Sequence, residues 1–263
     1  MATILEIDDL SYNGFSNINY SFKDKTYYSI IGSNNSGKTT LFKLIAGIIP
    51  SSSCIRCNDI DLNKRNINKY IVNLGIVTRV TSDSFKYNKV IDEMIYPLDN
   101  LGYSRNRSID RIKEILSLFN KSELINKRIT ELNSYDKEIL LIMIALLHKP
   151  KVLLLDSVLD IFPRIIYEEI NVIFNKLVKE GLTIINFTNS LELAYYSNKI
   201  ILLDKYKIIG EYLPKDILND DKLFYEHNLE IPFLVDLNIK LKMYDLINKD
   251  YSSMKEMVDD IWP

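Results

Sequence analysis

The chain has 263 residues, of which 47% are hydrophobic, and a formal net charge of −2 at neutral pH. That length suffices for one large α/β domain with an appendage, and the lack of a basic charge excess argues against a nucleic-acid partner. No apolar run approaches the ~20 residues that a membrane-spanning helix needs, and the N-terminal residues lack the apolar core of a signal peptide. We therefore expect a cytosolic protein that can dock on a membrane protein.

The first segments have the pattern of strands. Residues 4–7 and 17–22 are typical of strands, and the turn signal Asn13-Gly14 lies between them, which predicts an antiparallel hairpin. Residues 27–31 are β-branched and aromatic, which predicts a buried strand.

The pattern G-x-x-x-x-G-K-T follows that strand directly and is the most informative motif of the chain. Its glycines let the backbone turn so tightly that several N–H groups point inward, where they bind phosphate oxygens. Lys38 adds positive charge for the β- and γ-phosphates, Thr39 a hydroxyl ligand for Mg²⁺, and the following helix the positive end of its dipole. The predicted nucleotide-binding residues are Gly32, Ser33, Asn34, Asn35, Ser36, Gly37, Lys38, Thr39 and Thr40.

The only two cysteines, Cys54 and Cys57, have the spacing C-x-x-C. A single such pair supplies two ligands, so a zinc site would need others nearby. The segment also has the pattern of a short strand, in which residues three apart point to opposite faces. This favours reduced structural thiols over a metal or redox site.

Residues 88–148 are predicted to be mainly helical, and an apolar run then ends in Asp156. Such a run is typical of a parallel strand that is buried on both faces. A carboxylate at its end can hold Mg²⁺, as in a Walker B motif, although an aspartate after a strand can also cap a helix. The P-loop favours the Mg²⁺ role. Residues 183–187 predict another buried strand, residues 200–209 a hairpin, and the last ~40 residues amphipathic helices.

This order of motifs resembles an ABC-transporter ATPase cassette nearly from end to end. Segments 74–77, 90–93 and 98–102, and the tail segments 229–233 and 257–262, are similar to the energy-coupling factor branch, which serves cobalt and vitamin uptake. The resemblance implies an α/β P-loop NTPase fold with a RecA-like parallel sheet core, an antiparallel β subdomain and an α-helical subdomain. It implies a cassette over residues 1–225, with its helical part at about 86–150, and a helical dimerisation extension over 226–263.

In that family, two cassettes trap two ATP molecules, with Mg²⁺, between them. Each site combines the P-loop and Walker B residues of one subunit with the signature loop LSGGQ of the other. The resemblance therefore implies a second ABC ATPase subunit, a transmembrane scaffold subunit and a substrate-binding membrane subunit as partners. It places the chain on the cytoplasmic face of the membrane.

Three positions depart from the family pattern. Ser157 stands where the family has the catalytic glutamate, and a serine is no base near neutral pH, which typically costs a factor of ~10²–10⁴ in rate. Asn189 stands at the switch histidine and cannot carry an imidazolium charge. Arg79 stands at the Q-loop glutamine, where a cation cannot bind Mg²⁺ but can contact phosphate.

The signature loop is altered as well. Side chains replace the two glycines that approach the partner's γ-phosphate, and a carboxylate adds negative charge, so we expect weaker closure over ATP. Ser134 is also expected to cap the helix that follows. The corresponding residues are Leu132, Asn133, Ser134, Tyr135 and Asp136.

Because both composite sites are affected, we expect weak hydrolysis by this chain and a heterodimer with a more complete ATPase. Tyr12 is the candidate for stacking on the adenine, with a half-buried strand residue as the alternative. Another function compatible with the sequence is a nucleotide-binding scaffold or sensor without transport and with little or no ATPase activity.

Overall fold

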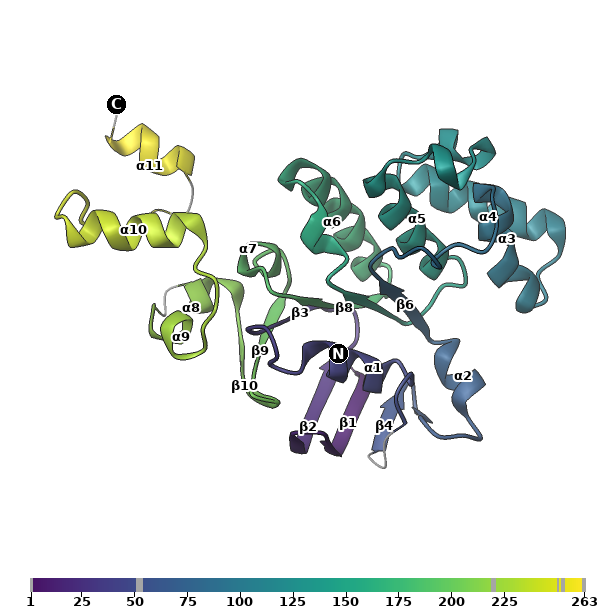
Figure 1. Cartoon of the computed structure of the whole chain (residues 1–263), viewed down its shortest axis with the longest axis horizontal. Coiled ribbons are helices and arrows are strands. Elements are labelled where there is room, and N and C mark those ends of the chain that lie inside the picture. Colours follow the sequence, from purple (N-terminus) through teal and green to yellow (C-terminus); the bar gives the residue numbers. More distant parts are fainter. Residues whose placement is uncertain (1, 51–53, 219–220, 250, 252–253, 262–263) are drawn as a thin grey trace.

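The computed structural model describes residues 2–50, 54–218, 221–249, 251 and 254–261. Trp262 and Pro263, the end of the predicted tail, lie outside the described residues. A six-stranded sheet with the order β10-β9-β3-β8-β7-β6 forms the centre of the molecule (Figure 1). The strands from β9 to β6 are mutually parallel, and β10 pairs antiparallel with β9. These strands are β3 (Tyr27–Ile31), β6 (Leu74–Thr78), β7 (Val152–Asp156), β8 (Thr183–Thr188), β9 (Lys199–Asp204) and β10 (Lys207–Tyr212).

A smaller sheet has the order β2-β1-β4-β5, and its described pairs are antiparallel. Its strands are β1 (Thr3–Tyr12), β2 (Phe15–Lys23), β4 (Cys54–Cys57) and β5 (Ile60–Asp61). The predicted hairpin about Asn13-Gly14 is confirmed. In β4, Cys54 is exposed and Cys57 is buried, as the strand pattern predicted. Burial raises the pKa of the Cys57 thiol to about 12, so this thiol stays protonated and suits a structural role.

Helix α1 (Lys38–Ile45) packs between the two sheets. Its residues Leu41, Phe42, Leu44 and Ile45 share one apolar cluster with side chains of both sheets. The strand β7 shows how the layers are built, because Val152 and Leu154 belong to this cluster while Leu153 and Leu155 belong to the cluster on the opposite face. This alternation follows from the two-residue period of a strand.

The opposite face of the large sheet is covered by helices that form the largest apolar cluster (Figure 1). Between β6 and β7 the chain folds into a helical unit, which confirms the helical prediction for this region. Short α2 (Ile67–Ile71) precedes β6. The helical unit consists of α3 (Val90–Asn100), α4 (Arg105–Leu118), η1 (Ser122–Asn126), η2 (Ile129–Glu131) and α5 (Ser134–Leu146). After β7 come η3 (Leu159–Ile161) and α6 (Arg164–Lys179).

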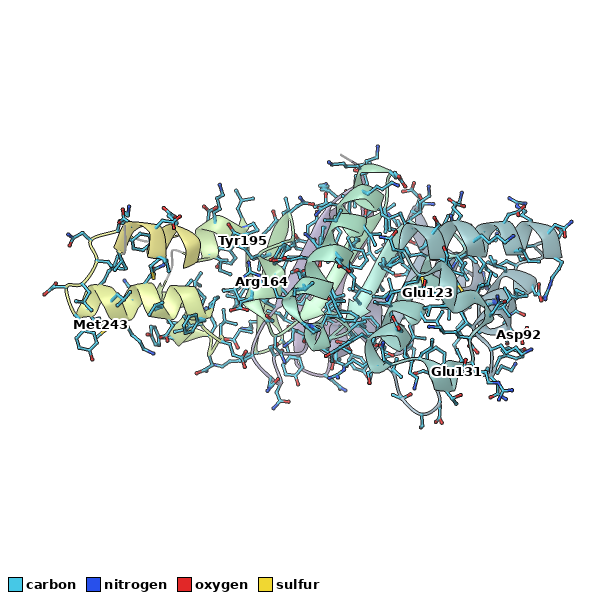
Figure 2. The ribbon with its side chains drawn as sticks, turned by 90° about the horizontal axis from the view of Figure 1, so that it is seen from above. Asp92, Glu123, Glu131, Arg164, Tyr195 and Met243 are labelled. Atoms are coloured by element: carbon cyan, nitrogen blue, oxygen red, sulfur yellow. The ribbon has the colours of Figure 1, made fainter. Side chains whose placement is uncertain are left out.

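Side chains from residues 191–194, 217 and 223–229 pack on β3 and β9 through one apolar cluster, and the two helices that follow extend away from the large sheet (Figure 1). Seen from above in Figure 2, Met243 lies near one end of the elongated molecule and Asp92 near the other. A small cluster of Ile247, Tyr251 and Met257 forms the core of this extension. None of the helices in the described part of the chain is long and apolar enough to cross a membrane. The helices that follow β8 in the chain are α7 (Leu191–Ala194), α8 (Pro214–Leu218), α9 (Asp221–Glu226), α10 (Phe233–Met243) and α11 (Met254–Ile261).

Candidate nucleotide-binding site

The predicted site residues emerge from neighbouring parallel strands at one edge of the large sheet. The register pairs Ile31 with Thr188, Asp156 with Phe187, and Thr78 with Asp156. The residues that follow the four strands are therefore brought to the same edge of the sheet, the one formed by the carboxyl ends of its parallel strands. Open α/β sheets bind their ligands at this edge. These residues are Gly32, Arg79, Ser157 and Asn189.

The P-loop leaves no room for side chains at its two glycines. A Cβ atom at Gly32 would lie 2.1 Å from the carbonyl oxygen of Leu203. Gly37 has a φ of +107°, and a Cβ atom there would lie 2.7 Å from the ring of Tyr206. The turn between them includes Asn35 at a φ of 66°. The loop therefore has the tight backbone that the motif predicts.

Lys38 lies over this loop and is only 8% exposed. Its Nζ donates hydrogen bonds to the carbonyl oxygens of Gly32 at 2.7 Å and Ser33 at 2.9 Å. Burial lowers the pKa of the ammonium group, and the nearby carboxylates of Asp156 and Asp160 oppose that shift. A cation is thus held at the centre of the loop, as binding of phosphate requires.

The predicted Mg²⁺ ligands lie together. Thr39, which is followed by Thr40 at the start of α1, donates from its Oγ1 to Oδ1 of Asp156 at 3.4 Å. Burial raises the pKa of Asp156, while Thr39 and Lys38 lower it. A hydroxyl and a carboxylate are hard oxygen donors of the kind that Mg²⁺ prefers. The donor set therefore fits this ion.

Ser157 has a left-handed backbone, with a φ of 56°. Its N–H donates to the carbonyl oxygen of Phe187 at 2.9 Å, which holds the turn after β7 against β8. A non-glycine residue in this conformation costs roughly 1–2 kcal/mol. The turn then leads into η3.

Asn189 and Thr188 join this edge to two other segments. The Asn189 amide donates to Oδ1 of Asn34 at 3.1 Å. The Thr188 hydroxyl donates to Oδ1 of Asp160 at 2.6 Å, and the backbone N–H of Asn189 donates to the same carboxylate. Asp160 was not predicted from the sequence, because its hydrogen-bond partner lies 28 positions away.

Arg79 is exposed. Its charge lowers the pKa values of both Glu138 and Asp160, in each case against a larger upward shift from burial. Glu138 is 3% exposed, and its Oε1 accepts a hydrogen bond from the backbone N–H of Val80 at 3.0 Å. The segment after β6 is therefore joined to α5.

The altered signature loop forms the start of α5. Asn133, not Ser134, caps this helix, because its Oδ1 accepts from the N–H of Asp136 at 2.8 Å. The prediction of Ser134 as the cap was wrong by one position. Leu132 is buried in the apolar cluster that includes the helices α3 to α6.

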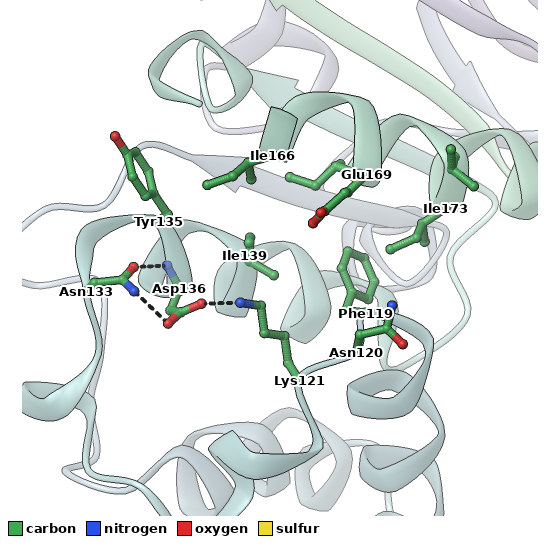
Figure 3. Close-up of a pocket in the computed structure, with 12 residues that line it drawn as sticks. Phe119, Asn120, Lys121, Asn133, Tyr135, Asp136, Ile139, Ile166, Glu169 and Ile173 are labelled. Carbon is green, nitrogen blue, oxygen red and sulfur yellow. Dashed lines mark hydrogen bonds and ion pairs between the residues drawn. The ribbon is translucent and has the colours of Figure 1, made fainter. Parts of the chain in front are cut away.

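The Asp136 carboxylate is not free to face a phosphate, because Lys121 Nζ lies 2.7 Å from its Oδ1. Asn133 Nδ2 also donates to its Oδ2 at 2.9 Å (Figure 3). Tyr135 and Asp136 border a cavity of about 310 Å³ between α5 and α6. The expected repulsion of phosphate by Asp136 is therefore partly neutralised within the chain.

Tyr12 is the last residue of β1, is half-buried and packs against the core of the two sheets. This position agrees with the half-buried strand residue of the alternative, while stacking of Tyr12 on the adenine stays a prediction. The rings of Tyr206 and Phe15 both lie against Gly37 of the P-loop, and the N–H of Tyr206 donates to the carbonyl oxygen of Ser36 at 2.9 Å. Tyr206 also packs edge-on against Phe15, with ring centroids 5.2 Å apart.

Comparison with known families gives a match over residues 15–159 to the family described as ABC transporter. The chain belongs to this family. The match covers more than half of the chain and includes the P-loop, Asp156 and the altered signature loop.

Relatives of this chain support its resemblance to the energy-coupling factor branch of the ABC transporter family. Energy-coupling factor transporter ATP-binding protein EcfA1 of Enterococcus faecalis is 23% identical, with 100% of this chain and 98% of that protein covered. The EcfA1 protein of Lactobacillus acidophilus is 29% identical, with 86% and 82% covered.

Solved structures agree with the fold. CbiO1 of Clostridium perfringens, described as part of the ABC transporter complex cbiONQ, has a TM-score of 0.77 and 25% identity over 89% of this chain and 98% of its own. The ADP conformation of MJ1267, an ATP-binding cassette of an ABC transporter, has a TM-score of 0.76 at 20% identity over 88% of this chain and 100% of its own. The α/β P-loop cassette fold predicted from the sequence is therefore confirmed.

Proposed function

We propose that this chain is an ATP-binding subunit of an energy-coupling factor type ABC importer, which couples ATP binding and hydrolysis to the uptake of a vitamin or metal ion. The observation that carries the proposal is the buried Lys38 on the P-loop, with Thr39 and Asp156 beside it at the same sheet edge. The likeness to EcfA1 proteins over nearly the whole chain supports the choice of branch.

In this function, the residues at the carboxyl ends of the parallel strands bind the phosphates of ATP and the Mg²⁺ ion. The backbone N–H groups of residues 32–37 and the Lys38 ammonium bind the phosphates, and Arg79 adds a second cation near the γ-phosphate. Thr39 and Asp156 hold Mg²⁺, whose charge would offset that of the phosphates. Asn189 donates its amide to the γ-phosphate in place of an imidazole.

Hydrolysis by this chain is proposed to be weak. Ser157 offers no carboxylate at the position after Asp156, and residues 132–136 offer a partner subunit a signature loop that carries side chains instead of glycines. A homodimer would contain both departures twice. We therefore propose a heterodimer in which a second, more complete ABC ATPase performs most of the turnover.

The assembly would place the chain on the cytoplasmic face of the membrane, bound to a transmembrane scaffold subunit and through it to a substrate-binding membrane subunit. Residues 1–225 would form the cassette, with its helical subdomain at about 86–150, and residues 226–263 the dimerisation extension. Met243, Tyr244 and Leu246 support this use of the extension, because all three are more than 60% exposed there. Such apolar surface is typical of a protein–protein contact.

Equilibrium binding of ATP with Mg²⁺ to the purified chain tests the nucleotide part of the proposal. Lys38→Ala should weaken binding by about a hundredfold or more, since it removes a charge-assisted contact to phosphate. Lys69→Ala, which removes an exposed lysine from α2, is the matched control and should bind as the unaltered chain does. Failure of the unaltered chain to bind ATP would contradict the proposal.

A further inference from the structure

The carboxylate of Asp160 is held at the P-loop edge of the sheet. It lies in η3, and its two donors, the Thr188 hydroxyl and the Asn189 N–H, come from the end of β8. Thr188 is in register with Ile31, the last residue before the P-loop. The neighbouring Asn189 side chain in turn contacts Asn34 within the P-loop. Asp160 is thus connected to the P-loop through a single residue, Asn189.

The charges around Asp160 are those of the predicted phosphate site. Its carboxylate interacts electrostatically with Lys38, Asp156 and Arg79. Asp160 also reaches solvent. A carboxylate has about four lone-pair sites, so the two donors leave capacity to accept a hydrogen bond from a water molecule.

The turn after β7 explains why the carboxylate lies at position 160. The left-handed Ser157, bonded to Phe187, redirects the chain along the end of β8. Val158 and Leu159 are then fully buried beneath this turn. Asp160 follows at the point where the chain reaches Thr188. Position 157 itself carries only a serine hydroxyl.

We propose that Asp160, and not residue 157, is the base for ATP hydrolysis at the P-loop of this chain. This inference rests on the proposed function. Asp160 accepts a proton from a water molecule as the water oxygen bonds to the γ-phosphorus. The bond from that phosphorus to the β–γ bridging oxygen breaks, and ADP leaves with the electron pair. Lys38 offsets the charge that develops on the phosphates.

The test uses the full chain and the substitution Asp160→Asn. Asparagine keeps a carbonyl oxygen that accepts from Thr188 and Asn189 but cannot take a proton. We expect its release of phosphate from ATP, measured above the background of Lys38→Ala, to fall at least about tenfold. Its affinity for ATP and its melting temperature should stay close to those of the unaltered chain. Asp110→Asn, which removes an exposed carboxylate from α4, is the matched control and should retain the full rate.

The outcomes distinguish failure of the role of Asp160 from failure of the proposed ATP-binding function. Unchanged phosphate release by Asp160→Asn would overturn the inference, as would a loss of ATP affinity as large as the loss of rate, which would indicate that Asp160 only holds the end of β8. An unaltered chain that binds ATP but releases no phosphate above the Lys38→Ala background would also overturn it and leave the ATP-binding function intact. An unaltered chain that binds no ATP would overturn both.

Discussion

The side-chain amide of Asn189 donates to Oδ1 of Asn34 at 3.1 Å and so joins the end of β8 to the P-loop. Both side chains are exposed, so the hydrogen bond adds little to the stability of the fold. The position of this hydrogen bond is more important for function than for stability. It connects the position of the family's switch histidine with the loop that would hold the phosphates. The chain keeps this connection with a neutral amide.

Asn189→Ala should weaken ATP binding by about two- to tenfold, the value of one ordinary hydrogen bond. The free energy of unfolding should change by less than about 0.5 kcal/mol, because the side chain is exposed. Titration of the chain with ATP and denaturation in urea measure the two quantities. Asn106→Ala, an exposed substitution on α4, is the control. Equal ATP affinities for the two variants would show that the amide does not act on the nucleotide.

Gly32→Ala should destabilise the chain by about 1–3 kcal/mol or more, as overpacking does. The new methyl group would lie 2.1 Å from the backbone oxygen of Leu203, which cannot move without disturbing β9. Gly102→Ala is the comparison, because its φ is +76° but no atom lies within 4 Å. It should cost only the backbone strain, roughly 1–2 kcal/mol. Urea denaturation of both variants checks the order, and a smaller loss at Gly32 would contradict this packing.

Lys121→Ala should destabilise the chain by about 1–3 kcal/mol, because it removes the cation from a carboxylate that has little access to water. The Asp136 side chain is 13% exposed. The double variant Lys121→Ala/Asp136→Asn should recover part of that loss. As a control, Lys240→Ala breaks an exposed pair with Asp236 and should cost less than about 1 kcal/mol. Equal losses for the two single variants would refute the structural role of the Lys121 pair.

Stability should depend on pH through Glu138. Burial raises the pKa of this carboxyl above its ordinary value of 4.5, so the folded chain binds the proton more tightly than the unfolded chain does. The contribution of Glu138 is then complete below pH 4.5 and is lost as the pH rises through the folded pKa. Glu138→Gln should flatten this part of the curve of unfolding free energy against pH. An unchanged slope in urea titrations from pH 4 to pH 7 would exclude this source.

The sequence predicted those parts of the site that depend on short-range patterns. The P-loop turn needs only neighbouring residues, and the apolar run that ends in Asp156 marks a buried strand by composition alone. Contacts between distant segments were not predictable in the same way. Asn34 meets Asn189 from 155 positions away, and Tyr206 reaches Gly37 across the sheet edge. Asp160 was missed because its position depends on the left-handed turn at Ser157, a conformation that serine does not signal.

The most direct test of the whole account is to tag this chain in its native host, extract the membranes in mild detergent and identify the proteins that co-purify. We predict recovery of a second ABC ATPase together with a polytopic membrane protein, in amounts comparable to the tagged chain. Recovery of the chain alone from the soluble fraction would contradict the importer function and favour a nucleotide-binding scaffold or sensor.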